Sequence, residues 1–200
     1  MRKPLWRLLG EVGVAAAVLV AGLWVLGDSA KRVEMHGDEV VAIMATPYFE
    51  YLFIRRDVHR EEWHDEGHAV HTHPMISRYI MGGWLWVQGY NQRRLPERTY
   101  RSSLSPEENR RQGRVPSQAL LAHARTPMVA SGAGAILVLY LLGRALAGVP
   151  AGLVAAGLAL GSPLAQEHLV RARPDPPFAL FFLLTLLLGV LGARRRHDGG

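Results

Sequence analysis

The stretch that decides the fold class is MVASGAGAILVLYLLGRAL, residues 128–146, which is apolar along almost its whole length. A helix needs roughly 20 apolar residues to cross the hydrocarbon core of a bilayer, and about 17 is the lower end. Residues 8–26 form a second segment of this length, whereas the apolar segments 149–164 and 178–191 are shorter and need flanking residues. We therefore predict an all-α integral membrane protein with about four transmembrane helices.

The distribution of charge predicts how these helices are oriented. The chain of 200 residues is 49% hydrophobic and has a formal net charge of +6. Acidic and basic residues nearly balance between residues 28 and 126, so the basic surplus lies mainly at the chain ends, in Arg2, Lys3, Arg7, Arg194, Arg195 and Arg196. Basic residues are enriched on the cytoplasmic side of membrane proteins, whereas a nucleic-acid-binding protein would carry a continuous basic face. We expect a multi-pass protein of the plasma (inner) membrane with both termini in the cytoplasm and no nucleic-acid partner.

Two cytoplasmic termini require an even number of spans, and this divides the chain into four parts. Residues 1–27 are expected to be an N-terminal transmembrane anchor, because the apolar segment is longer than the roughly 7–15 residues of a signal peptide. Residues 28–126 would form a long extracytoplasmic loop, residues 127–193 a three-helix transmembrane segment, and residues 194–200 a cytoplasmic basic tail.

The long outer loop contains helical patterns of its own. Residues 40–54 and 76–90 are rich in apolar and aromatic side chains and are predicted to be interfacial helices, which lie on the bilayer or against the bundle. Residues 91–118 look like a solvated connection with one short helix, because SPEE at 105–108 is a helix start signal. The absence of cysteine excludes disulfide bonds and thiolate metal sites.

Asp38 and Glu39 follow the first apolar segment closely and precede a helical pattern that starts near Val40. One interpretation is structural: Asp38 caps this helix, and Glu39 favours its positive end. The other is catalytic, with Asp38 as a general base that a short helix holds at the membrane surface. In the predicted topology, Asp38 lies at the same outer face as residues 171–175.

The segment RARPD at 171–175 contains a second group of charged residues before an apolar helix. In the structural interpretation Asp175 caps that helix, the prolines at 176–177 occupy its first turn, and Arg173 reaches the membrane interface. In the functional interpretation Arg171 and Arg173 hold a lipid-linked phosphate, because a guanidinium binds phosphate through two parallel hydrogen bonds.

Histidines are concentrated in the middle of the long loop. His64 and His68 are four residues apart and would share one helix face, as metal ligands can. The order of residues differs from the H-E-x-x-H pattern of metalloproteases, and Gly67 weakens the helix, so a solvated loop and a divalent-metal site both stay open. The full set is His59, His64, His68, His71 and His73, with Glu61, Glu62, Asp65 and Glu66 among them.

The order of these motifs resembles the N-terminal part of the GT-C membrane glycosyltransferases, of the dolichyl-phosphate-mannose protein mannosyltransferase and aminoarabinose transferase type. An anchor helix is followed by HGDE at 36–39, HTHPMISRYIMGGWLWVQGY at 71–90 and ARTPMVASGAGAILVLYLLGRALAG at 124–148. SPLAQEHLVRARPD at 162–175 and an apolar helix that ends in arginines come next. The resemblance covers nearly the whole chain.

The resemblance implies transfer of a sugar from a polyprenyl-phosphate donor to an acceptor hydroxyl at the outer face, with inversion at the anomeric carbon. Asp38 matches the acid that is expected to be the catalytic base, and Glu39 accompanies it. Asp175 matches the acid of the family's Arg-Pro-Asp motif. Cationic groups or a divalent metal would offset the charge that develops on the departing phosphate.

The candidate substrate-binding residues are Arg171 and Arg173, from their chemistry toward phosphate, and His73, from the resemblance. His73-Pro74 matches the family's His-Pro-Pro, although Met75 stands where the family has the second proline. This departure affects the local turn more than the chemistry.

The resemblance also predicts the molecules with which the chain would interact. Family members usually carry many more membrane helices, so we expect this chain to be a fragment or to work with a complementary membrane chain in a lipid bilayer. The acceptor is open among protein, lipid and polysaccharide, and a divalent metal is the cofactor to consider. The alternative function is non-catalytic: a four-helix membrane protein whose His-rich outer loop binds a metal or a protein partner.

Overall fold

The computed structural model of the chain describes residues 5–57, 75–91, 94–96 and 98–198. This part of the chain is mainly helical and contains no strand. The prediction of an all-α protein is therefore confirmed.

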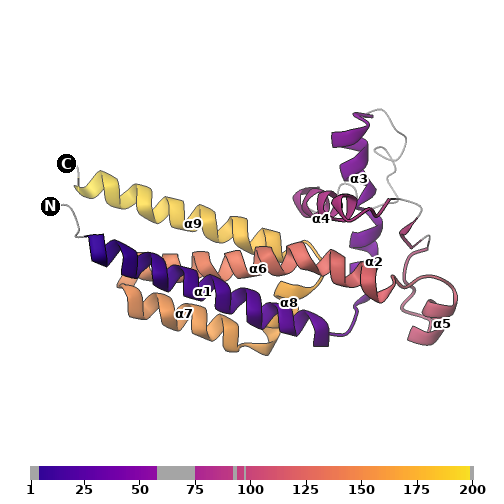
Figure 1. The fold of residues 1–200 in the computed structure, drawn as a ribbon, viewed down its shortest axis with the longest axis horizontal. Helices are drawn as coiled ribbons and strands as arrows, with labels where there is room; N and C mark the ends of the chain where they lie inside the picture. Colours follow the sequence, from indigo (N-terminus) through magenta and orange to yellow (C-terminus); the bar gives the residue numbers. More distant parts are fainter. Residues whose placement is uncertain (1–4, 58–74, 92–93, 97, 199–200) are drawn as a thin grey trace.

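A bundle of long helices forms the body of the molecule (Figure 1). Its members are α1 (Leu5–Arg32), α6 (Gln118–Ala147), α7 (Val149–Gly161) and α9 (Asp175–Asp198). Helix α6 packs against the other three, and α1, α6 and α9 are each long and apolar enough to cross a membrane. After a bend of 77°, α7 continues into α8 (Pro163–Val170), and this pair gives a fourth candidate if it is one broken span. The bundle is that of a multi-pass membrane protein.

The two ends of the bundle differ in character. The start of α1, the end of α9 and the turn between α6 and α7 lie at one end (Figure 1). At that turn Gly148 takes a φ of +90°, which glycine adopts without strain. Near the same end, Arg144 of α6 forms an ion pair with Glu11 of α1. The short helices that follow α1 lie at the opposite end.

Those short helices make an outer layer. They are α2 (Gly37–Met44), α3 (Pro47–Phe49), the π-helical turn η1 (Glu50–Ile54), α4 (Met75–Val87) and α5 (Pro106–Arg111). Helical structure is thus present where the patterns at 40–54 and 76–90 predict it, although the first pattern is broken near Pro47. Ser105 caps α5 by accepting a hydrogen bond from the Glu108 N–H, as the start signal at 105–108 predicts.

The helix boundaries differ from those expected at residues 27 and 127. Helix α1 continues to Arg32, and α6 begins at Gln118, so Pro127 lies inside α6. A proline inside a helix removes one hydrogen bond and usually ends the helix, which is why the sequence pattern favours a boundary there. Tertiary packing of α6 outweighs this cost.

Two apolar clusters hold the layers together, and α6 contributes to both. The cluster within the bundle contains Val18, Leu26, Ala133, Ile136, Tyr140, Ala156 and Val170. The cluster that joins α6 to α2 and α4 contains Ile43, Met81, Leu85, Leu120, Leu121, Ala124, Met128 and Ala172. The N-terminal part of α6 therefore fixes the outer layer to the bundle.

Candidate functional site

Glu39 lies at the junction between the outer layer and the bundle, where its side chain is 0% exposed. Its Oε1 accepts hydrogen bonds from Nε of Arg125 at 2.9 Å and from the Ala172 N–H at 2.8 Å. Its Oε2 accepts from Nη2 of Arg125 at 2.8 Å and from the His36 N–H at 2.9 Å. A carboxylate tolerates burial only when it is paired and hydrogen-bonded, and Glu39 meets both conditions.

Arg125 belongs to α6 and is itself buried. Its Nη1 donates to the carbonyl oxygens of Ala30 and Val33 at 2.7 and 2.8 Å, and its Nη2 to that of Glu34 at 3.3 Å. The carbonyl groups in the last turn of a helix lack partners within the helix and carry partial negative charge. One guanidinium therefore caps α1 and neutralises Glu39 of α2.

The turn between α8 and α9 closes the junction from the other side. Arg171 in this turn is buried, and it donates to the carbonyl oxygen of Glu34 and to the carboxylate of Glu167. Its Nη1 lies 3.7 Å from Oε2 of Glu39. Arg171 thus has protein partners in this conformation, and contact between Arg171 and a phosphate stays a prediction.

Asp38 lies next to this buried network but faces outward, with 60% of its side chain exposed. Nη2 of Arg173 lies 3.4 Å from Oδ2 of Asp38, and Nε of Arg173 lies 3.3 Å from Oδ2 of Asp175. This Asp175 oxygen is shielded from solvent and has no aligned hydrogen bond, so its contact with Arg173 is an ion pair alone. The structure brings Asp38, Arg173 and Asp175 together at one end of the bundle.

The residue that caps α2 is His36, which corrects the expectation that Asp38 is the cap. Nδ1 of His36 accepts a hydrogen bond from the Asp38 N–H, while the Glu39 carboxylate accepts one from the His36 N–H, so the two residues form a capping box. The Asp38 carboxylate takes no part in this cap. Asp175 is the first residue of α9 rather than a residue that precedes it.

His73 and the rest of the His-rich stretch lie outside the described residues, so the substrate contact of His73 and the metal site there stay predictions. Within residues 5–57, 75–91, 94–96 and 98–198, no group of three or more His, Cys, Asp or Glu side chains is placed to hold a metal ion.

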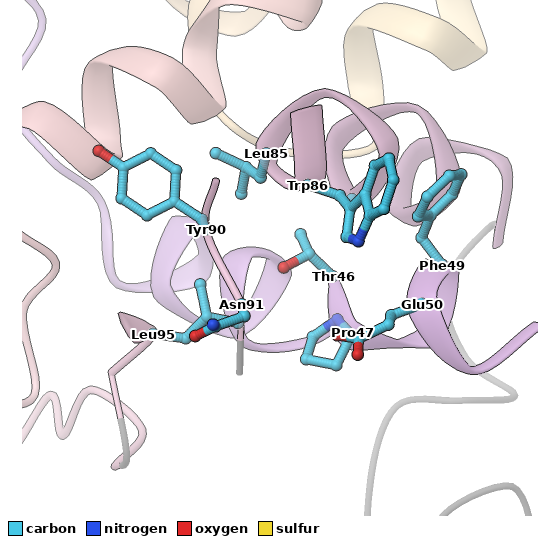
Figure 2. Close-up of a pocket in the computed structure, with 10 residues that line it drawn as sticks. Thr46, Pro47, Phe49, Glu50, Leu85, Trp86, Tyr90, Asn91 and Leu95 are labelled. Carbon is cyan, nitrogen blue, oxygen red and sulfur yellow. The ribbon is translucent and has the colours of Figure 1, made fainter. Parts of the chain in front are cut away.

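A shallow pocket opens elsewhere in the outer layer, between the segment that follows α2 and helix α4 (Figure 2). Its lining includes Thr46 and Phe49 from the segment that follows α2, and Leu85 and Trp86 from α4. The candidate acids do not line it. The cluster of Asp38, Arg173 and Asp175, in which Asp38 is exposed, is therefore the better candidate for chemistry.

The electrostatics of Glu39 follow from its contacts. Burial on its own raises the pKa of Glu39, but hydrogen bonds from Arg125, His36 and Ala172 favour the charged form and hold the pKa below its ordinary value of 4.5. Glu39 is therefore a permanently charged structural group near neutral pH, and its position suits it to hold Asp38 in place rather than to touch a substrate.

Two contributors to this site were not identified from the sequence. Arg125 stands just before the apolar stretch at 128–146. A charged residue in this place was the signal that could have pointed to it. His36 stands three residues before Glu39, the spacing of a capping box, but histidine is not among the preferred cap residues.

Comparison of the chain with known protein families, with curated proteins and with solved structures finds no match.

Loss of the Arg125 side chain should strongly destabilise the fold. Arg125→Met leaves a buried carboxylate without its cation, so we expect the free energy of unfolding in detergent micelles to fall by about 3–5 kcal/mol. The double variant Arg125→Met with Glu39→Met should lose less than Arg125→Met alone, because no unpaired charge remains buried. Arg32→Met, which breaks an exposed ion pair with Asp28, is the matched control and should cost at most about 1 kcal/mol. Equal losses for Arg125→Met and Arg32→Met would contradict this role.

The stabilising effect of Glu39 should depend on pH in a defined direction. Because its folded-state pKa lies below the ordinary value of 4.5, its contribution is complete above that pH. The contribution is lost as the pH falls toward the folded-state pKa, because the unfolded state then takes up a proton more readily than the folded state does. We expect wild type to be more stable than Glu39→Gln at neutral pH and the difference to narrow below pH 4.5, as measured by denaturant unfolding. A constant difference down to about pH 3 would contradict the assignment.

Proposed function

We propose that the chain is a membrane glycosyltransferase, or the N-terminal part of one, that moves a sugar from a polyprenyl-phosphate donor to an acceptor hydroxyl with inversion. The observation that supports this most is the convergence of Asp38 and Asp175 on Arg173 at one end of the bundle. The order of motifs along the chain, which resembles the GT-C enzymes, supports the same reaction.

Each residue of the cluster has a distinct role in this proposal. Asp38 is the general base, because its exposed carboxylate can reach an acceptor hydroxyl. Arg173 lies between two carboxylates and lowers their mutual repulsion, and its charge also offsets the charge on a departing phosphate. Asp175 holds Arg173 from the other side. Glu39 positions Asp38 from within the protein and does not contact substrate.

The reaction is a single displacement at the anomeric carbon. The acceptor oxygen attacks that carbon while its proton passes to Asp38. The bond between the anomeric carbon and the phosphate oxygen breaks, and its electron pair leaves with the polyprenyl phosphate. Attack from the face opposite the leaving group inverts the configuration.

The proposed orientation puts the Asp38 end at the outer face of the plasma (inner) membrane and both termini in the cytoplasm. Only 17% of the apolar window of α1, and the same share of that of α9, is buried inside the chain, so most of this surface is open to lipid or to other helices. A complementary membrane chain on this surface would complete the donor groove. The acceptor is a hydroxyl of a protein, a lipid or a polysaccharide.

Removal of the proposed base should abolish transfer. Membranes that contain the chain are given radiolabelled polyprenyl-phosphate-mannose, and the release of label from the lipid fraction is measured. Asp38→Asn should slow transfer by about 10²–10⁴-fold, because the carboxylate that takes the proton is lost. Glu107→Gln, which removes an exposed carboxylate of α5, is the matched control and should transfer at the wild-type rate. Equal rates for Asp38→Asn and wild type would remove Asp38 from the reaction.

The proposed orientation can be tested with single cysteines, since the chain has none of its own. Ser102→Cys and Arg196→Cys each introduce a thiol at an exposed position, one before α5 and one near the end of α9. In sealed cells a membrane-impermeant maleimide should label Ser102→Cys at once and Arg196→Cys only after the membrane is opened. Labelling of both variants in sealed cells, or the reverse order, would overturn the proposed topology.

A further inference from the structure

His36 makes two contacts with Asp38 through the same ring atom. Its Nδ1 accepts a hydrogen bond from the Asp38 N–H at 3.2 Å, and it lies 3.4 Å from Oδ2 of the Asp38 carboxylate. The imidazole is half exposed, so protons can reach it from solvent. The backbone of His36 is fixed separately, because its N–H donates to the buried carboxylate of Glu39.

These two contacts require different protonation states of the ring. To accept from the Asp38 N–H, Nδ1 must keep its lone pair, which is the neutral form with the proton on Nε2. Once Nδ1 binds a proton it becomes a donor, and the Asp38 carboxylate is the acceptor within reach. A single proton therefore replaces a helix cap with an ion pair to Asp38.

The surroundings of His36 contain charges of both signs. On α2, Asp38 and Glu39 are acids, and Glu39 is already neutralised by Arg125. From α8, Glu167 is close enough to respond to the charge of His36 and of His168, and its carboxylate is paired with Arg171. From the turn before α9, Arg173 approaches the same Asp38 oxygen that faces the imidazole. Asp38 is thus the acid on which a protonated His36 would act most directly.

We propose that His36 is the proton-accepting partner of Asp38, so that the base of the transfer is a His36–Asp38 dyad. The inference rests on the proposed function. The acceptor proton moves to Asp38 as the acceptor oxygen bonds to the anomeric carbon and the phosphate leaves with the electron pair of the broken bond. The proton then passes from Oδ2 of Asp38 to Nδ1 of His36 and from there to water. An imidazole retains a proton near neutral pH far better than a carboxylate does, so the dyad removes the proton more completely than Asp38 alone.

His36 acts through Asp38, so it is a positioning and proton-accepting residue, and its test must separate this role from simple capping. Asparagine is a good helix cap but binds no proton near neutral pH, whereas alanine does neither. Both His36→Asn and His36→Ala should transfer label about 10²-fold more slowly than wild type. Only His36→Ala should lower the unfolding temperature in detergent.

The pH profile gives the second readout. The wild-type rate should fall as the pH is lowered, because a His36 ring that is already protonated at Nδ1 can no longer accept the proton. The transfer rate of His36→Asn should stay constant over the same change of pH. A wild-type rate and a wild-type pH profile for His36→Asn would show that His36 only caps the helix and would overturn the dyad.

A titration without any substrate separates this inference from the proposed function. The His36 ring of the full chain in micelles is followed by ¹⁵N NMR and assigned by its absence from His36→Asn. With the ring protonated, Asp38→Asn should change the ¹⁵N chemical shift of His36 Nδ1, because the ring loses the carboxylate oxygen that lies 3.4 Å from it. An unchanged ¹⁵N shift would overturn the pairing. No transfer by the wild-type chain would overturn the proposed function, and the titration would still decide whether the two side chains are coupled.

Discussion

The ion pair of Glu39 and Arg125 is the interaction on which the rest of this end of the molecule depends. Removal of two charges from water costs several kcal/mol for each ion, and only well-aligned partners offset that cost. Here the partners are the carbonyl oxygens at the end of α1, the N–H group that begins α2 and the N–H of Ala172 before α9. Three parts of the chain that are distant in the sequence, residues 30–39, Arg125 and Ala172, must therefore meet in one arrangement for the pair to be satisfied.

This buried arrangement determines where the neighbouring charges lie. The exposed Asp38 precedes Glu39, and the partly buried Arg173 follows Ala172, so each of these charges is next to a residue that is fixed from inside. Glu39 binds groups inside the protein, whereas Asp38 faces solvent. A group that must meet a substrate at hydrogen-bond distance benefits from such support, because little reorganisation is needed when the substrate arrives.

The sequence predicts the fold class well because long apolar segments have few alternatives to membrane helices. It also predicts that Asp38 and residues 171–175 lie at one end, since the order of spans places them there. It does not predict Arg125 as the partner of Glu39, because 86 residues separate them and no local pattern links them. The start of α6 at Gln118, before Pro127, is missed for a similar reason. Helix packing there outweighs the tendency of a proline to end a helix.

The break between α7 and α8 has a consequence for the surrounding lipid. Helix α7 has 13 residues, which at 1.5 Å per residue span about 20 Å, well short of the roughly 30 Å of a hydrocarbon core. At the break, the Gln166 side chain donates to the carbonyl oxygen of Leu160 and accepts from the Ser29 hydroxyl, so it links α7 and α8 to α1. A bilayer adapts to a short apolar segment by becoming thinner around it. Head groups would then approach the turn that contains Arg171 and Arg173, and a lipid-anchored molecule would reach that turn without leaving its leaflet.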